Sequence, residues 1–305
     1  MLLEFGLEPK VVGADWRQCK YLLEKFGFDR GRLIAAFPKQ WQRAVHEAAA
    51  DLSDMDRKRV ETLLARAKSA LVRSGRNYDP ELEWFANAVA QQAVSPFHAI
   101  IADQNSDGRD DVLVAADVDE EVPLFQSSHG WQVQRTGAAL AEAMGPLLSY
   151  SREIWFVDPF FSVLELPYVE TLRTCLAAVA ASGNVGAKLQ IHYRENDRRP
   201  PTDELERRIP RSLAGVIPAG MSISLHAWAE RDAGEDMHAR YLLTDRGGLS
   251  VEAGFSAVGP HQNVDLHLLT PQVCEAKRRA FADGAAYKQE GPVLIIGSDC
   301  QVTRR

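Results

Sequence analysis

The stretch MHARYLLTDRGGLSVEAGFS, from Met237 to Ser256, constrains the fold of this chain more than any other. Two short apolar runs flank Gly247-Gly248, a pattern typical of two strands joined by a tight turn, with polar residues at the strand ends. In an extended segment, side chains two residues apart project from the same face, so His238 and Arg240 are expected to point the same way. An imidazole and a guanidinium on one face can share a phosphate: the cation binds the oxygens, and the imidazole attacks phosphorus or moves a proton.

The same stretch resembles the signature of the phospholipase D superfamily, in which His-x-Lys is followed by Asp after four residues and then by Gly-Ser and Asn-x-Glu. The matching residues are His238, Asp245, Gly254, Ser256 and Asn263, with Asp265 where the family has Glu. Arg240 replaces the family's Lys, and a Phe separates Gly254 from Ser256. This form is most similar to divergent members, including the phospholipase-D-like domain that follows MIT domains, some of which are regarded as binding modules.

The resemblance implies roles for these residues. His238 would be the nucleophile in one subunit and the general acid in the other, and Arg240 would clamp phosphate oxygens. Asp245 completes the catalytic motif, in a supporting position. Ser256 and Asn263 would donate hydrogen bonds to phosphate, and Asp265 would orient the imidazole. This chemistry needs two histidines but no metal or cofactor. Because the chain contains one copy of the motif, the resemblance implies a homodimer with two His238 side chains across its axis.

A second constraint on the fold is the continuous apolar run from Ile154 to Val157, which predicts a strand buried on both faces. Asp158-Pro159 ends the run. Phospholipase-D-like domains contain a similar sequence pattern, in which a strand is followed by Asp, Pro and an aromatic residue. Two interpretations of Asp158 stay open. It lines the substrate site from the carboxyl edge of the sheet, where open α/β sheets bind ligands, or it caps the loop before the next helix.

Residues 96–305 are predicted to form an α/β domain, because segments with strand patterns alternate with segments with helix patterns. Together with the resemblance, this predicts a phospholipase-D-like α/β/α layered domain. The predicted helices span residues 135–150, 166–181, 202 onward and 271–281. The predicted strands include residues 154–157, 188–193, 221–228 and 293–296.

Residues 1–95 are expected to form a separate helical module, because their apolar residues recur at helical spacing. Such a module packs or dimerises, or it recognises a protein partner or nucleic acid. Ser95-Pro96 is the predicted boundary. Beyond it, the apolar runs at residues 97–102 and 112–116 flank a polar loop and predict a β-hairpin.

The composition, with 46% hydrophobic and 25% charged residues, is that of an ordinary globular protein. No apolar run approaches the ~20 residues that span a bilayer, and the N-terminus lacks a basic region before its short apolar stretch. We therefore expect a cytoplasmic protein with no membrane-spanning segment. The scattered cysteines indicate neither a disulfide framework nor a zinc site; they are Cys19, Cys175, Cys274 and Cys300.

The net charge of −7 argues against nucleic-acid binding over the whole surface. A local basic groove is still compatible with this charge. The densest basic stretch contains Arg194, Arg198, Arg199, Arg207, Arg208 and Arg211. These arginines form either a track for a phosphate backbone beside the site or a solvated helix face, since acidic residues are interspersed among them.

The first functional hypothesis is therefore that the protein is a metal-independent phosphodiesterase, preferably a nuclease. A nucleic acid is a better candidate substrate than a lipid, because the sequence contains no membrane-binding stretch. The resemblance adds DNA restriction or phage defence as a setting in which prokaryotic enzymes of this type often act. The second hypothesis is a phospholipase-D-like module that has lost catalysis and binds a phosphate-bearing ligand or a protein partner. Arg240 and the lone motif favour this second hypothesis. A third is a helical adaptor whose α/β domain serves only as a scaffold.

Overall fold

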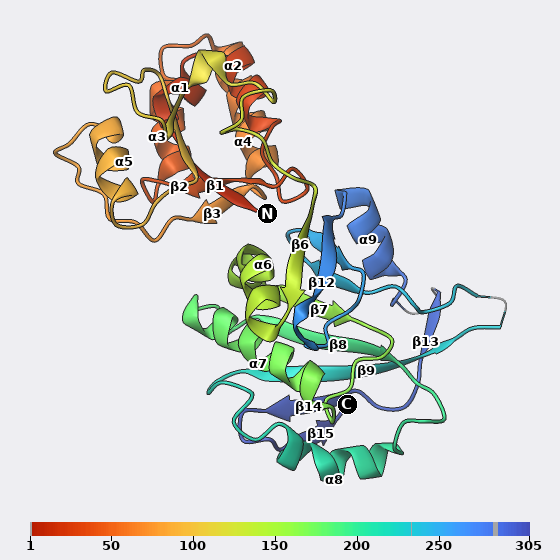
Figure 1. Cartoon of the computed structure of the whole chain (residues 1–305). Helices are drawn as coiled ribbons and strands as arrows, with labels where there is room; N and C mark the ends of the chain where they lie inside the picture. Colours follow the sequence, from red (N-terminus) through yellow and green to blue (C-terminus); the bar gives the residue numbers. More distant parts are fainter. Residues whose placement is uncertain (1, 233, 283–285) are drawn as a thin grey trace. The chain divides into compact units, whose positions relative to one another are not determined.

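The computed structural model describes residues 2–232, 234–282 and 286–305, and the chain forms two compact units (Figure 1). Unit 1 comprises Met1–His129 and unit 2 comprises Gly130–Arg305. Each unit has its own β-sheet with helices packed against it, so the predicted α/β layered class is confirmed. None of the helices in the described part of the chain combines the length and hydrophobicity that a transmembrane helix needs.

Unit 1 is built on a parallel sheet with the strand order β3-β2-β1-β4-β5. The strands are β1 (Leu3–Leu7), β2 (Arg32–Ala36), β3 (Leu71–Arg73), β4 (Ala99–Ala102) and β5 (Val112–Val114). The helices are α1 (Pro9–Gly13), α2 (Trp16–Leu23), α3 (Trp41–Ala48), α4 (Asp54–Ala67), α5 (Trp84–Gln92) and the 3-10 turn η1 (Ala115–Asp117). The central strands are almost entirely buried, as expected where helices cover both faces of a parallel sheet.

The structure corrects three expectations for this region. Residues 1–95 are not a helical module, because they contain β1, β2 and β3. Short apolar runs buried on both faces lack the alternation that separates a strand from a buried helix, so periodicity alone misassigned them. The boundary lies at residue 129 rather than 95, because β4 pairs with β1 inside unit 1. Finally, β4 and β5 pair in parallel, so they do not form the expected hairpin.

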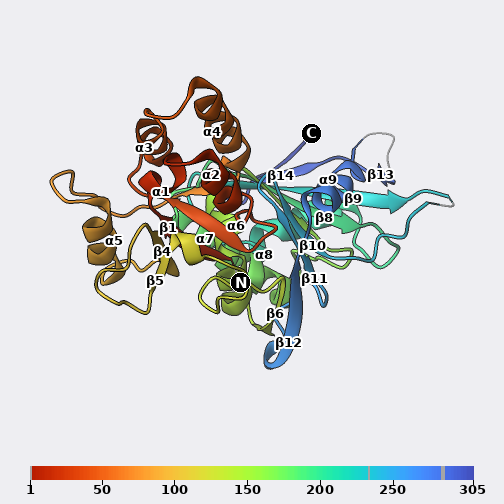
Figure 2. The ribbon, with the colours of Figure 1, turned by 90° about the horizontal axis from the view of Figure 1, so that it is seen from above.

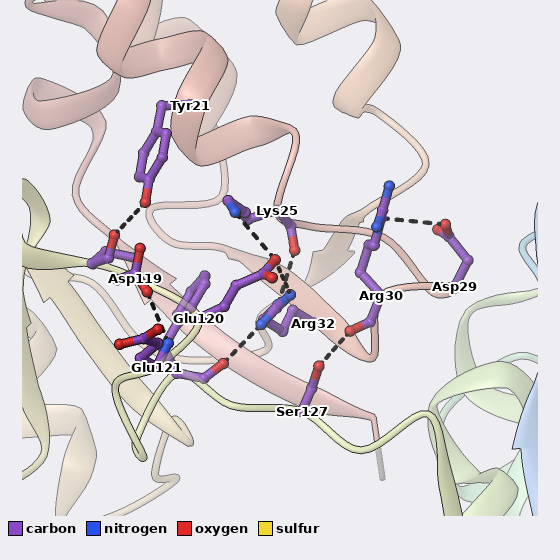
Figure 3. A network of polar contacts seen from close by, with 11 residues as sticks. Tyr21, Lys25, Asp29, Arg30, Arg32, Asp119, Glu120, Glu121 and Ser127 are labelled. Carbon is purple, nitrogen blue, oxygen red and sulfur yellow. Dashed lines mark hydrogen bonds and ion pairs between the residues drawn. The ribbon is translucent and has the colours of Figure 1, made fainter.

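The segment after β5 is fixed to unit 1 by a buried arginine, Arg32, which is only 4% exposed (Figure 3). Its guanidinium donates to the carbonyls of Lys25 and Phe125, both at 2.9 Å, and lies 3.4 Å from the Glu120 carboxylate. The Tyr21 hydroxyl donates to the same segment. Burial lowers the pKa of Arg32, and the Glu120 charge opposes that shift. These contacts explain why the chain up to residue 129 belongs to unit 1.

Unit 2 is built on a mixed sheet with the order β15-β14-β9-β8-β7-β10-β11-β12-β6, and β13 pairs with β9. Figure 2 shows β12 and β6 together at one end of this sheet. The strands are β6 (Gly130–Arg135), β7 (Glu153–Val157), β8 (Lys188–Arg194), β9 (Ser222–Glu230), β10 (Tyr241–Thr244), β11 (Gly248–Val251), β12 (Gly259–Leu268), β13 (Tyr287–Gln289), β14 (Leu294–Gly297) and β15 (Val302–Arg304). The helices are α6 (Gly137–Tyr150), α7 (Leu166–Ala181), α8 (Thr202–Ser212) and α9 (Pro271–Arg279).

The helices predicted for unit 2 are confirmed, and so are the predicted strands within β7, β8, β9 and β14. α6 and α7 pack against each other, and α9 contacts β10. β7, β8 and β9 run parallel, whereas β10 is antiparallel to β7. The carboxyl ends of the three parallel strands therefore lie at the same edge of the sheet as the start of β10.

Two histidines in unit 2, His192 and His226, are buried and stacked, as expected of structural rather than catalytic residues. Their ring centroids are 4.7 Å apart with an interplanar angle of 8°, and Trp155 stacks on His192. The Trp228 indole donates to His192 Nδ1, which requires a neutral acceptor nitrogen. Burial lowers the pKa of His226 to about 4 and lowers the pKa of His192 well below its usual value.

The revised boundary predicts which fragments fold. A fragment of residues 1–129 should unfold cooperatively in urea, whereas residues 1–95 should not, because they lack β4 and β5. Within the longer fragment, Arg32→Met should lower the free energy of unfolding by about 1–3 kcal/mol, since it leaves buried carbonyls without donors. The exposed Arg43→Met serves as the matched control. A cooperative transition for residues 1–95 would contradict the assignment.

The stacked histidines predict a dependence of stability on pH. The unfolded state binds a proton near pH 6.5, whereas folded His226 does so only at about pH 4. The free energy of unfolding should therefore fall as the pH falls through this window, by up to about 1.4 kcal/mol per pH unit for each such histidine. Urea unfolding at pH 7 and pH 5 measures this slope. His226→Gln should flatten it and the exposed His261→Gln should not; equal slopes in both variants would refute the assignment.

Candidate active site at the carboxyl edge of the unit 2 sheet

The predicted histidine and arginine lie at the edge where the parallel strands of unit 2 end. His238 and Arg240 immediately precede β10, whose first residue, Tyr241, is paired with Val157 at the end of β7. His238 is exposed and lies in an irregular segment rather than on a strand, while Arg240 is partly buried. Open α/β sheets bind ligands at this edge, so the motif is placed where a substrate can reach it.

Asp158 holds Arg240 at this edge. Its side chain is 1% exposed, and its Oδ1 lies 4.0 Å from Arg240 Nε. Asp158 also accepts hydrogen bonds from the backbone N–H groups of Phe160 (2.9 Å) and Phe255 (3.1 Å). Burial raises the pKa of this carboxyl, and the two N–H groups and the cations of Arg240 and Arg199 oppose the shift. Asp158 thus fixes the loop after β7 to the turn after β11, as expected of the loop-capping interpretation, and that it also lines the substrate site remains a prediction.

The turn after β11 is shaped to accept this carboxylate. Gly254 has a φ of +74°, and a Cβ at this position would collide with Asp158 Oδ2 and lie 3.4 Å from Arg240 Cγ. Glycine is therefore required here by both the backbone conformation and the space. Arg240 Nη1 donates to the carbonyl of Glu252 at 3.2 Å, while its Nε is buried without a hydrogen-bond partner among the described residues.

The exposed part of the site is a cluster of two arginines around an aromatic ring. The guanidinium carbon atoms of Arg240 and Arg194 lie 5.2 and 5.7 Å from the ring centroid of Phe160. Phe160 is 46% exposed, an unusual position for a large apolar side chain. Arg194 ends β8 and Phe160 follows β7, so the three residues come from three strands of the same edge. The arrangement presents positive charge and an accessible aromatic face to one ligand.

A carboxylate that interacts with the charge of His238 is Glu230, at the end of β9. Glu230 accepts from Arg194 at 3.0 Å and from the backbone N–H of Met237 at 2.8 Å. These two hydrogen bonds lower the pKa of Glu230, and the charges of Arg194 and His238 lower it further. Within the described residues, no hydrogen bond fixes the His238 ring itself. Sequence analysis missed Glu230 and Phe160, because neither belongs to the motif.

Asp245, predicted as the third catalytic residue, lies at the opposite end of β10. Roughly 17 Å of extended chain separates it from Arg240. Its Oδ1 accepts from the backbone N–H groups of Arg152 (2.8 Å) and Glu153 (3.1 Å), just before and at the start of β7. Asp245 therefore anchors β7 and does not reach the site, which corrects its catalytic assignment and agrees with a supporting position.

The predicted phosphate ligands are only partly brought together. Ser256 lies near the Gly254 turn, but its Oγ accepts from Arg135 at 2.5 Å. Asn263 and Asp265 share one face of β12, where both bond to the side chain of Gln132, at 2.8 and 3.0 Å. Two strand spacings, about 10 Å, separate β12 from β10. Asp265 is therefore not placed to orient the imidazole, which corrects that expectation.

Most of the predicted arginine track is engaged locally. Arg199 donates to the carbonyls of Arg194, Phe161 and Pro159, at 2.7, 2.9 and 2.9 Å. Arg208 pairs with Glu204 within α8. Arg194 is the member of the track that lies in the arginine and aromatic cluster. A cavity of about 280 Å³ adjoins this cluster; its walls include Phe160, Tyr168, Asn196, Arg198 and Arg199.

Unit 1 carries a larger cavity, of about 470 Å³, between α2 and α4. Its walls include Trp16 and several cations, but no histidine or cysteine lines it, and the Trp16 ring is already contacted by the guanidinium groups of Arg17 and Arg59. No grouping of three or more His, Cys, Asp or Glu side chains suited to a metal ion occurs among residues 2–232, 234–282 and 286–305. The motif residues and the arginine and aromatic cluster lie in unit 2.

Comparison with known proteins does not identify a family. No family model matches the chain, and no curated protein is significantly similar to it in sequence. Among solved structures, it is similar to TrmBL2, an archaeal chromatin protein whose structure shows a novel mode of DNA binding, with 14% identity and a TM-score of 0.28 over 55% of each chain. It is also similar to polyphosphate kinase from Porphyromonas gingivalis, with 16% identity and a TM-score of 0.32, over 51% of this chain and 26% of that one. The chain thus spans about half the length of the first and a quarter of the second, and likeness at this level assigns neither family nor activity.

Proposed function

We propose that unit 2 is a phosphodiesterase of the phospholipase D type, acting through His238. The observation that carries the proposal is that exposed His238 precedes Arg240 by two residues and acts electrostatically on Glu230, which binds Arg194, so that it belongs to the edge that holds the arginine and aromatic cluster. Arg240 and Arg194 offer the fixed positive charge that a phosphate group requires. Glu230 takes the place proposed from sequence for Asp265, as the carboxylate that orients the imidazole.

In the proposed reaction, His238 of one subunit attacks phosphorus. A phosphorus–nitrogen bond forms as the bond to the leaving oxygen breaks, and the leaving oxygen takes a proton from His238 of a second copy. Water then attacks the phosphohistidine and gives its proton to that second imidazole, which restores both histidines. A two-fold dimer supplies the second imidazole without further sequence. Neither a metal ion nor a cofactor takes part in the proposed steps.

The preferred substrate is a nucleic acid, which makes the protein a nuclease. A guanidinium pair beside an exposed aromatic ring is suited to a backbone phosphate next to a base. Unit 1, with its basic cavity, is proposed as the part that engages a protein partner or the substrate polymer. Restriction of foreign DNA or defence against phage is the setting in which such an enzyme would act, and localisation in the cytoplasm is part of the same proposal.

A second candidate function is a binding module without turnover. It is favoured by the hydrogen bond from Arg240 Nη1 to Glu252 and by the lack of a hydrogen bond that fixes the His238 ring among the described residues. In this alternative, the site holds a phosphate-bearing ligand or a protein partner, and a second imidazole is not needed.

Cleavage in the presence of EDTA distinguishes the two functions. The purified protein should hydrolyse bis(p-nitrophenyl) phosphate or labelled oligonucleotides of DNA or RNA under these conditions. His238→Ala should reduce the rate by at least about 100-fold, because it removes both the nucleophile and the acid. His261→Ala, an exposed histidine on β12, is the matched control and should retain the wild-type rate. Binding without turnover by a folded wild-type protein would favour the second function.

Mixing the wild type with His238→Ala tests the shared site. If each site needs one imidazole from each copy, an equal mixture after subunit exchange should show about one quarter of the activity of the same total amount of wild type, since only pairs of wild-type subunits work. A monomeric site would retain about half of that activity, and this result would exclude the two-histidine mechanism. Light scattering on the same samples measures the oligomeric state.

A further inference from the structure

We propose that the cavity beside the arginine and aromatic cluster is a nucleobase subsite, formed by Phe160, Tyr168, Asn196 and Arg198. The inference rests on the proposed function, because it names the substrate of the same site as a nucleic acid with an unpaired base. The cavity adjoins the groups proposed to hold the phosphate, since Phe160 belongs to both. A nucleotide carries both a phosphate and a flat ring, so one such ligand can occupy the arginine cluster and the adjoining cavity together.

The walls of the cavity are suited to a planar ring. Phe160 is 46% exposed, so a large part of its surface stays open although two guanidinium groups approach it. Tyr168 lines the cavity from the first turns of α7. Burial raises the pKa of Tyr168 to about 12, and the negative charges of Asp158 and Glu165 contribute. Like any tyrosine, it is protonated near pH 7, so its hydroxyl can donate a hydrogen bond to a base or a sugar.

Polar groups also line the cavity. The Asn196 side chain uses its Oδ1 to accept from the backbone N–H of Arg198, which leaves its amide N–H groups directed elsewhere. Glu165 and Ser162 also line the cavity and offer acceptors. Arg198 and Arg199 add cationic donors to the wall, and the Glu165 carboxylate accepts hydrogen bonds, so the lining offers a heterocycle both donors and acceptors.

Hydrogen bonds fix the loop that forms one wall of the cavity. Arg199 ties the loop after β7 to the end of β8 through its hydrogen bonds to Pro159, Phe161 and Arg194, and its guanidinium lies 4.4 Å from the Tyr193 ring. The Ser212 hydroxyl donates to Val163 in the same loop. The loop that carries Phe160 is therefore fixed on both sides, as a preformed subsite requires.

The size of the cavity limits the ligand. Its volume of about 280 Å³ is slightly below the ~300 Å³ at which pockets for drug-sized molecules begin, so it accommodates one base rather than a stack of several. A base in a duplex cannot enter such a cavity without leaving the stack. The inferred substrate is consequently a single strand, or an unpaired end or bulge.

The test is a binding measurement that does not depend on turnover. Fluorescence anisotropy with the full-length His238→Ala protein would compare a labelled oligothymidylate with an abasic strand of the same number of phosphates. The oligothymidylate should bind at least about fivefold more tightly, because stacking of a base on an aromatic side chain contributes that much. Phe160→Ala should remove the preference, whereas Phe160→Tyr should keep it. Val185→Ala, at an exposed apolar residue of the same unit, should leave it unchanged.

Equal affinities for the two strands, no measurable binding to either, or a preference that survives Phe160→Ala would overturn the subsite. The melting temperature of each variant shows that it is folded, and the exposure of Phe160 makes Phe160→Ala a mild change for the fold. The outcome is separable from that of the proposed function. A protein that binds the oligothymidylate more tightly but cleaves nothing would support the subsite and contradict the phosphodiesterase proposal. A protein that cleaves but binds both strands equally would support the phosphodiesterase proposal and contradict the subsite.

Discussion

Asp158 is a buried carboxylate that three parts of unit 2 depend on. Its oxygens accept hydrogen bonds from the backbone N–H groups of Phe160 and Phe255, and its carboxylate lies 4.0 Å from the guanidinium group of Arg240. Burying a carboxylate without such partners would destabilise the folded state, so the loss of any one partner should lower the free energy of unfolding. The pairing therefore links the end of β7, the turn after β11 and the residue before β10. The charge of Asp158 and the hydrogen bond from Arg240 Nη1 to the Glu252 carbonyl together place Arg240 at the proposed phosphate site.

The rest of the candidate site is assembled from segments that are distant in sequence. Phe160, Arg194 and Glu230 each follow or end one of the three parallel strands, and His238 enters from the segment before β10. The parallel direction of these strands places their carboxyl ends together, which is why residues up to about eighty positions apart meet at one edge. The chain has a net charge of −7, so the positive charge that Arg194 and Arg240 place at this edge is local.

Sequence reasoning predicted the fold of unit 2 well, because its helices and buried strands have distinct patterns. It failed for unit 1, where buried apolar strands such as Leu3–Leu7 look like parts of helices. For the site, the motif drew attention to His238 and Arg240, which lie at the edge of the sheet where Asp158 ends β7, although His238 precedes the strand rather than lying on it. It could not show that Asp245 anchors the far end of β7 or that Asn263 and Asp265 bond to Gln132, because these facts depend on strand register. The only sequence feature that pointed to Phe160 was its place as the aromatic residue directly after Asp158-Pro159.

The most direct measurement is a crystal structure of the protein with tungstate, which mimics a transferring phosphoryl group. We predict that the anion binds at the carboxyl edge of the unit 2 sheet, in contact with His238 and Arg240 and beside Phe160. In the phosphodiesterase form of the account, His238 of a second copy lies on its opposite side. Tungstate bound at the cations of the unit 1 cavity, with the His238 edge empty, would contradict the central claim.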